Sequence, residues 1–94
     1  MTIKRSNKPG KKYMAIFEKD NGRTKTQHFG AAGMPDYTLT GDKERRRLYR
    51  QRHAKDLKTN DPTRAGYLSR FLLWGDSTSL RENIRNYKRR FNLK

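Results

Sequence analysis

An alternation of apolar and polar positions predicts a β-hairpin near the start of the chain. Residues 12–19 and 24–29 are rich in strand-forming side chains. The segment between them, residues 20–23, has the sequence Asp-Asn-Gly-Arg, and its Asn-Gly pair favours a tight turn. A lone hairpin is only marginally stable, so we expect helices to cover at least one of its faces.

The Asn-Gly pair also predicts how the two strands pair, because a two-residue turn fixes their register. In this register Met14 faces Phe29, and Glu18 faces Lys25. One face of the hairpin then carries Met14, Ile16 and Phe29 above an ion pair between Glu18 and Lys25.

Three helical segments follow the hairpin, and each has a recognisable start signal. The first begins after Asp42, whose carboxylate suits an N-cap. The second begins at Asp61-Pro62, a capping carboxylate followed by proline, and should end where Gly75 adopts the left-handed conformation. The third begins at Ser79 with a serine–glutamate capping box.

These elements predict a small α+β domain, in which a two-stranded antiparallel β-hairpin packs on three α-helices. The domain covers residues 11–94, and residues 1–10 are expected to be a flexible basic arm because they contain little apolar material. Its core should be formed by eleven apolar residues of the hairpin and helices: Met14, Ile16, Phe29, Leu48, Leu68, Phe71, Leu72, Trp74, Ile84, Tyr87 and Phe91.

The charge of the chain is strongly one-sided. Among 94 residues, 24 are lysine or arginine and nine are acidic, which gives a net charge of +15. The excess is concentrated in residues 1–12, 43–58 and 81–94. Such an imbalance costs stability through self-repulsion, so a polyanionic partner is expected: nucleic acid, acidic lipid or an acidic protein surface.

The segment from Asp42 to Lys55 is the most basic, with seven cationic side chains among fourteen residues. It has two interpretations, a phosphate-binding helix or a solvated helix whose charges are neutralised by salt bridges. The second needs acidic neighbours at helical spacing, and only Glu44 comes close. Nucleic-acid binding is therefore favoured, and three separate basic segments agree with it.

We expect this binding to favour duplex DNA and to lack strong sequence specificity. A helix-turn-helix is disfavoured because its would-be recognition helix is the most apolar of the three. Tyr13, Phe17, Tyr37 and Tyr49 are candidates for stacking on unpaired bases, although core packing is more common for such residues. The predicted phosphate contacts come from the arm, the basic helix and the last helix: Lys4, Arg5, Lys8, Lys11, Lys12, Arg45, Arg46, Arg47, Arg50, Arg52, Arg85, Lys88 and Arg89.

Several other functions are disfavoured by what the chain lacks. Without cysteine it has no disulfide and no thiolate metal site, and His28 and His53 alone cannot hold a metal ion. No Ser-His-Asp or paired-carboxylate arrangement emerges, so we expect neither an enzyme nor a cofactor. No apolar run is long enough to span a membrane, and no hydrophobic signal core indicates secretion. Binding to a membrane surface is less favoured than binding to nucleic acid, because the apolar face of the last helix is needed to pack against the core.

Three strings of the sequence resemble a family of short basic proteins encoded by nucleocytoplasmic large DNA viruses. They are the Phe-Gly turn with its Asp-Tyr-Thr connector at 29–38, the Arg- and His-containing helix at 47–53 and the Leu-Leu-Trp helix at 65–74. The resemblance covers about residues 11–91 and supplies a setting without a mechanism. It also implies that Asp36 of the connector bonds backbone amides and is not part of an active site.

This resemblance implies a location in the virion or the infected host cell, either in its nucleus or in a cytoplasmic virus factory. Two functions suit a small basic domain there. The protein would neutralise or compact DNA in the virion or nucleoid, or it would be a minor capsid or scaffold protein whose cations bind acidic surfaces of other proteins.

Overall fold

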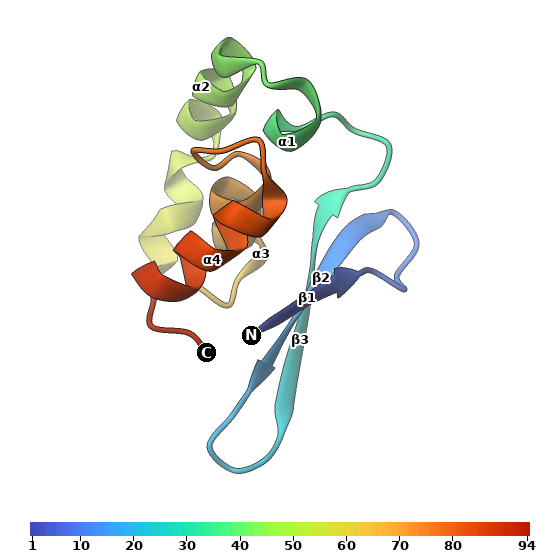
Figure 1. Cartoon of the computed structure of the whole chain (residues 1–94), viewed down its shortest axis with the longest axis vertical. Coiled ribbons are helices and arrows are strands. Elements are labelled where there is room, and N and C mark those ends of the chain that lie inside the picture. The colour runs from blue at the N-terminus through green and yellow to red at the C-terminus, as the bar shows by residue number, and fades with distance from the viewer.

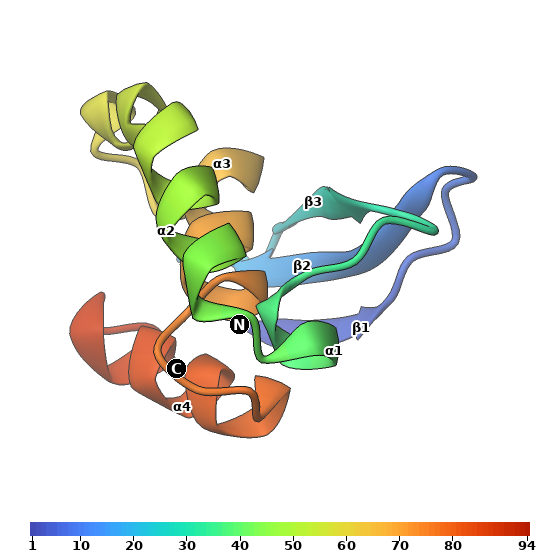
Figure 2. The same ribbon diagram turned by 90° about the horizontal axis from the view of Figure 1, so that it is seen from above.

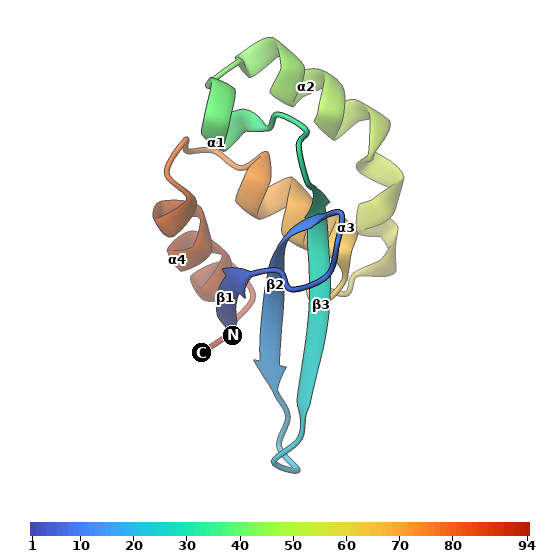
Figure 3. The ribbon, with the colours of Figure 1, turned by 90° about the vertical axis from the view of Figure 1, so that its right-hand side faces the viewer.

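The computed structural model describes residues 1–94 and contains a three-stranded antiparallel sheet with the helices gathered on one side of it (Figures 1 and 2). The strands lie in the order β1, β2, β3, so neighbours in the sequence are neighbours in the sheet (Figure 3). The elements in chain order are β1 (Thr2–Arg5), β2 (Lys11–Glu18), β3 (Thr24–Ala31), α1 (Tyr37–Thr40), α2 (Lys43–Arg52), the 3-10 helix η1 (Ala54–Thr59), α3 (Ala65–Leu68), the π-helix η2 (Ser69–Leu73) and α4 (Leu80–Arg90). None of the helices combines the length and the apolar character that crossing a membrane requires.

The predicted α+β class is confirmed, whereas the two-stranded sheet and the count of three helices are corrected. Residues 1–10 do not form a separate arm, because residues 2–5 pair with β2 as a third strand. Ile3 lies opposite Ala15 in this strand and packs against the core. The Met1 ammonium group also donates a hydrogen bond to the Lys94 carbonyl. Two apolar side chains, Met1 and Ile3, and the backbone hydrogen bonds to β2 thus hold a segment that is mostly polar in sequence.

The hairpin forms where predicted, but its register is shifted by one residue. The Lys19 N–H donates to the Arg23 carbonyl at 2.8 Å, which leaves a loop of three residues instead of two. Gly22 ends this loop in the left-handed conformation, with φ at 81°, as is typical of three-residue hairpin loops. Phe29 therefore pairs with Tyr13, and not with Met14.

This shift decides which face of the sheet is buried. Phe29 now shares a face with Ala15 and Phe17, and all three are buried against the helices. Met14 and Ile16 lie on the opposite face and are only half-buried. Their predicted place in the core is wrong, because a one-residue slip moves every side chain of a strand to the other face.

Most of the predicted helical core is confirmed. Leu68, Leu72 and Tyr87 are buried with Phe29, and the half-buried predicted residues Phe71, Trp74, Ile84 and Phe91 pack against this cluster. Leu48 is wrong as a core residue, since 43% of it is exposed. The buried hydrophobic residues that the sequence did not predict are Ala15, Phe17, Tyr37, Tyr67 and Leu73.

Two of the three predicted helix starts are confirmed. The Asp42 carboxylate accepts hydrogen bonds from the backbone N–H groups of Glu44 and Arg45, and the Ser79 hydroxyl accepts one from Glu82. Asp61 instead caps a turn through Thr63, so regular helix begins only at Ala65. The Asp61–Thr63 turn therefore corrects the predicted start at Pro62.

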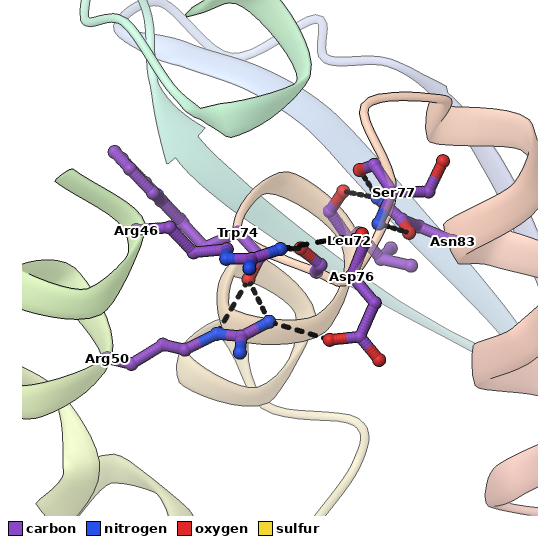
Figure 4. Close-up of polar contacts among 8 residues, drawn as sticks. Arg46, Arg50, Leu72, Trp74, Asp76, Ser77 and Asn83 are labelled. Atoms are coloured by element: carbon purple, nitrogen blue, oxygen red, sulfur yellow. Dashed lines mark hydrogen bonds and ion pairs between the residues drawn. The ribbon is translucent and has the colours of Figure 1, made fainter. Parts of the chain in front are cut away.

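The end of the central helix is built differently from the prediction. Trp74 N–H donates to the Ser69 carbonyl at 3.0 Å, a bond across five residues that defines the π-helical turn η2. Gly75 is not left-handed; it is needed because a Cβ there would lie 2.2 Å from the Phe71 carbonyl oxygen. The side-chain amide of the buried Asn83 donates to the Leu72 and Ser77 carbonyls, which fixes α4 against this turn (Figure 4).

Replacing Leu68 by alanine should lower the free energy of unfolding by about 2–5 kcal/mol, because it leaves a cavity in a fully buried position. The matched control is Leu48→Ala, which should change it by less than about 0.5 kcal/mol because Leu48 is exposed. Urea unfolding followed by circular dichroism measures both. Equal losses of unfolding free energy in the two variants would show that Leu48 of α2 is buried and not exposed.

Candidate nucleic-acid interface

Most of the cationic side chains of this protein have no acidic partner. Of the 24 lysine and arginine residues, only five make an ion pair with a carboxylate. The paired ones are Lys12, Arg45, Arg47, Arg50 and Arg64. The predicted contact residues therefore divide into those that the fold itself uses and those that are free to meet a ligand.

Two predicted contacts on α2, Arg46 and Arg50, turn inward and serve the fold (Figure 4). Arg50 donates to the Trp74 carbonyl through Nε at 3.1 Å and Nη2 at 2.9 Å, and Nη2 also reaches Asp76 Oδ1 at 3.0 Å. Arg46 Nη1 donates to the Gly75 carbonyl at 3.2 Å. These carbonyls lie at the C-terminal end of η2, where helical carbonyl groups lack partners and attract cations. The hydrogen bond from Arg50 lowers the pKa of the Asp76 carboxyl.

Two further predicted contacts, Arg45 and Arg47, lie on the exposed side of α2. Arg47 pairs with Glu44 at 2.5 Å, and Arg45 Nε lies 3.8 Å from Asp42. The hydrogen bond from Arg47 lowers the pKa of the Glu44 carboxyl. The basic helix is therefore more neutralised by its own acids than the sequence predicted. Water screens such exposed pairs, so a phosphate can replace the carboxylate at little cost.

Lys12 is also used by the fold. Its ammonium group pairs with Asp36, and the two side chains are only 13% and 3% exposed. Asp36 in turn accepts a hydrogen bond from the Thr38 N–H at 2.9 Å and caps α1. The expectation that Asp36 bonds backbone amides is confirmed, and Lys12 anchors the connector from β2.

The predicted contacts that remain have no ion pair in the structure. All are exposed except Lys88, which is half-buried. They lie on β1, on the β1–β2 loop and the start of β2, at the end of α2 and along α4: Lys4, Arg5, Lys8, Lys11, Arg52, Arg85, Lys88 and Arg89.

A cavity of about 400 Å³ brings two of these cations together from separate segments, Lys11 of β2 and Arg52 of α2. Three stacked rings belong to its lining: the Tyr49 ring lies 4.5 Å from Trp74 at 7° and 4.2 Å from His53 at 25°. Burial raises the pKa of the Tyr49 hydroxyl. We call this the aromatic cavity. Cations at the rim of an aromatic wall are a combination that suits nucleotides.

The other aromatic candidates are less available to a base. Phe17 and Tyr37 are buried, and Tyr13 packs on Phe29 with ring centroids 6.0 Å apart. The two histidines make separate local contacts: His28 Nδ1 lies 2.7 Å from the Ser6 hydroxyl, and His53 Nδ1 lies 3.1 Å from Asp56 Oδ2.

Sequence reasoning missed a group of arginines at the junction of η2 and α4. Arg70 lies in the most apolar helical segment of the sequence, yet it is half-buried beside Arg46, Arg50 and Arg90. No sequence signal indicates this cluster, because its members come from three different helices.

A family model described as a family of unknown function (DUF5754) matches residues 1–53, more than half of the chain. The chain belongs to this family. No curated protein and no solved structure matches it. The DUF5754 region contains the sheet, α1 and α2, including the three cations that line the aromatic cavity, Lys11, Lys12 and Arg52. It ends before η1 and the helices that complete the core.

Replacing Arg50 by glutamine should lower the free energy of unfolding by about 1–2 kcal/mol, because the Trp74 carbonyl loses a charged donor. The control Arg52→Gln removes the same charge from a side chain without a protein partner and should change it by less than about 0.5 kcal/mol. Urea unfolding at about 0.15 M salt compares them. If both variants have the same free energy of unfolding, the hydrogen bonds from Arg50 to the Trp74 carbonyl contribute no stability. Arg50 would then be as available to a ligand as Arg52.

Proposed function

We propose that this protein binds nucleic acid without strong sequence specificity, favours duplex DNA and uses the cations that lack an acidic partner. One observation carries the proposal: ion pairs neutralise only five of 24 lysine and arginine residues. A fold that leaves so many cations unpaired is destabilised by their mutual repulsion. Phosphates remove that repulsion, and the release of their counterions adds a large favourable entropy.

The part of this surface best suited to contact nucleic acid surrounds the aromatic cavity. Lys11 and Arg52 line it, and Lys8 precedes it in the β1–β2 loop. Lys4 and Arg5 extend the charge along β1. A second row of cations without an acidic partner lies on α4: Arg85, Lys88 and Arg89. Arg45 and Arg47 on α2 can join them, because a phosphate can replace the carboxylates of their exposed ion pairs.

A broad basic surface of this kind neutralises charge more readily than it reads sequence. Phosphate contacts fix position along a duplex but carry no base information. In the viral setting that the sequence resemblance implies, this would mean neutralisation or compaction of DNA in the virion or nucleoid. The same cations would also suit an acidic protein surface, such as that of a capsid or scaffold, so the test must separate the two.

Binding to a random-sequence duplex should weaken steeply with salt, with the logarithm of affinity falling by about 0.9 per phosphate contact for each unit of log salt. The variant Lys11→Gln/Arg52→Gln should reduce this slope by about two, since each lost contact removes about one. Its matched control is Lys19→Gln/Arg23→Gln, which removes the same charge at the far tip of the hairpin (Figure 1). Fluorescence anisotropy of the labelled duplex at several salt concentrations gives both slopes.

A failure to bind duplex at low salt would rule out DNA as the partner. Equal slope changes in the two double variants would show that only net charge matters and that the aromatic cavity has no special part. Parallel titrations with single-stranded DNA, with RNA and with an acidic polypeptide such as polyglutamate rank the competing polyanions. Binding to polyglutamate as tight as to duplex would favour the acidic-protein function.

A further inference from the structure

A second cavity, of about 210 Å³, lies between η2 and α4 and is separate from the aromatic cavity. Its lining includes two arginines and an asparagine, namely Arg70, Arg90 and Asn86, beside the rings of Phe71 and Tyr87. We call it the arginine cavity. The only carboxylate in its lining is Asp76.

The guanidinium groups of this cavity are held in place without using their hydrogen-bond donors. Arg70 Cζ lies 4.5 Å and Arg90 Cζ 5.0 Å from the centroid of the Phe71 ring. Neither side chain makes an ion pair or a hydrogen bond with another protein group. Stacking on a ring orients a guanidinium while its five N–H donors stay free. The donors are thus prepositioned for a ligand that accepts several of them at once.

The electrostatic environment of Arg70 also favours the binding of an anion. Burial, reinforced by the charge of Arg50, lowers the pKa of its guanidinium to about 10. Arg46 and Arg90 act in the same direction, and Asp76 opposes them. Asp76 does not neutralise the cluster, because its Oδ1 is bound by Arg50 and its side chain is 90% exposed. The cluster of four arginines therefore has one carboxylate, Asp76, near it. By contrast, Arg45 and Arg47 on the exposed side of α2 each have an acidic partner.

We propose that the arginine cavity binds a phosphate group, with Arg70 and Arg90 as its cationic donors and the Asn86 side-chain amide as a neutral one. A tetrahedral dianion or a phosphodiester offers several acceptors in the geometry that guanidinium groups prefer. Two sources share this chemistry, a backbone phosphate of nucleic acid and free phosphate. The first rests on the proposed function, because the cavity would then hold one phosphate of the bound strand.

The first experiment uses inorganic phosphate and the side-chain amide signals of the full chain in ¹⁵N NMR. The Asn86 signal should shift saturably with phosphate, and sodium chloride at equal ionic strength should not reproduce the shift. Arg70→Gln should abolish the effect. The melting temperature of the Arg70→Gln variant should equal or exceed that of the unmodified protein, because the substitution removes a partly buried positive charge that lies near other positive charges. A fall in melting temperature together with an unchanged phosphate response would make Arg70 a structural residue and overturn the proposal.

The second experiment separates the two sources with a random-sequence duplex. Arg70→Gln/Arg90→Gln should weaken duplex binding at least tenfold at about 0.1 M salt, since both charged donors to the bound phosphate are lost. Lys19→Gln/Arg23→Gln, a control with the same change of charge, should weaken it by less than about threefold, because these residues lie in the hairpin loop and do not line the arginine cavity.

The outcomes distinguish this proposal from the function on which it rests. Phosphate binding without duplex binding would support the arginine cavity as a site for free phosphate and overturn the nucleic-acid function. Duplex binding that both double variants weaken equally, with no saturable phosphate response, would overturn the cavity and leave the nucleic-acid function standing.

Discussion

The arrangement of the helices depends on the carbonyl groups at the C-terminal end of η2. Arg46 and Arg50 reach them from α2, and Asn83 reaches them from α4, so one turn of backbone is held from two sides (Figure 4). The carbonyls at a helix end have no intrahelical partner, and burying them without donors would cost stability. Long cationic side chains satisfy them across a gap that a short side chain would not bridge. Part of the basic character of α2 is thereby explained by architecture alone.

The cations elsewhere on the surface have no such structural role. This difference is the reason for assigning them a function in binding. Where a cation serves the fold, the structure supplies it with acceptors, as it does for Arg50, or with a buried acid, as it does for Lys12. The cations of β1, of the β1–β2 loop and of α4 have neither. A basic composition alone would not separate these two groups, because both look the same in sequence. Only their contacts show which of them a ligand would have to satisfy.

How far the sequence predicts this structure depends on the range of each signal. Local signals succeeded: the Asp42 and Ser79 caps and the position of the hairpin are set by residues that lie within a few positions of one another. The predicted strand register was wrong because the same Asn-Gly pair fits a three-residue loop, which places Phe29 on the same face as Ala15 and Phe17. Pairing of residues 2–5 with β2, and the arginines that meet at η2, depend on contacts between distant parts of the chain. Some predicted contact residues, such as Arg52, are therefore exposed as a contact requires. The list did not anticipate that Lys12 pairs with a buried aspartate, and it left out Arg70, which lines the arginine cavity.

The π-helical turn has a consequence for how the two cavities relate. Residues 69–74 lie between the two cavities. Ser69, Leu73 and Trp74 line the aromatic cavity, whereas Arg70 and Phe71 line the arginine cavity. A π-turn accommodates one residue more than a regular α-helical turn, so changes in its winding rotate the side chains on both of its sides together. The two cavities therefore share this turn as a common wall, and a substitution that changes its winding would alter the lining of both.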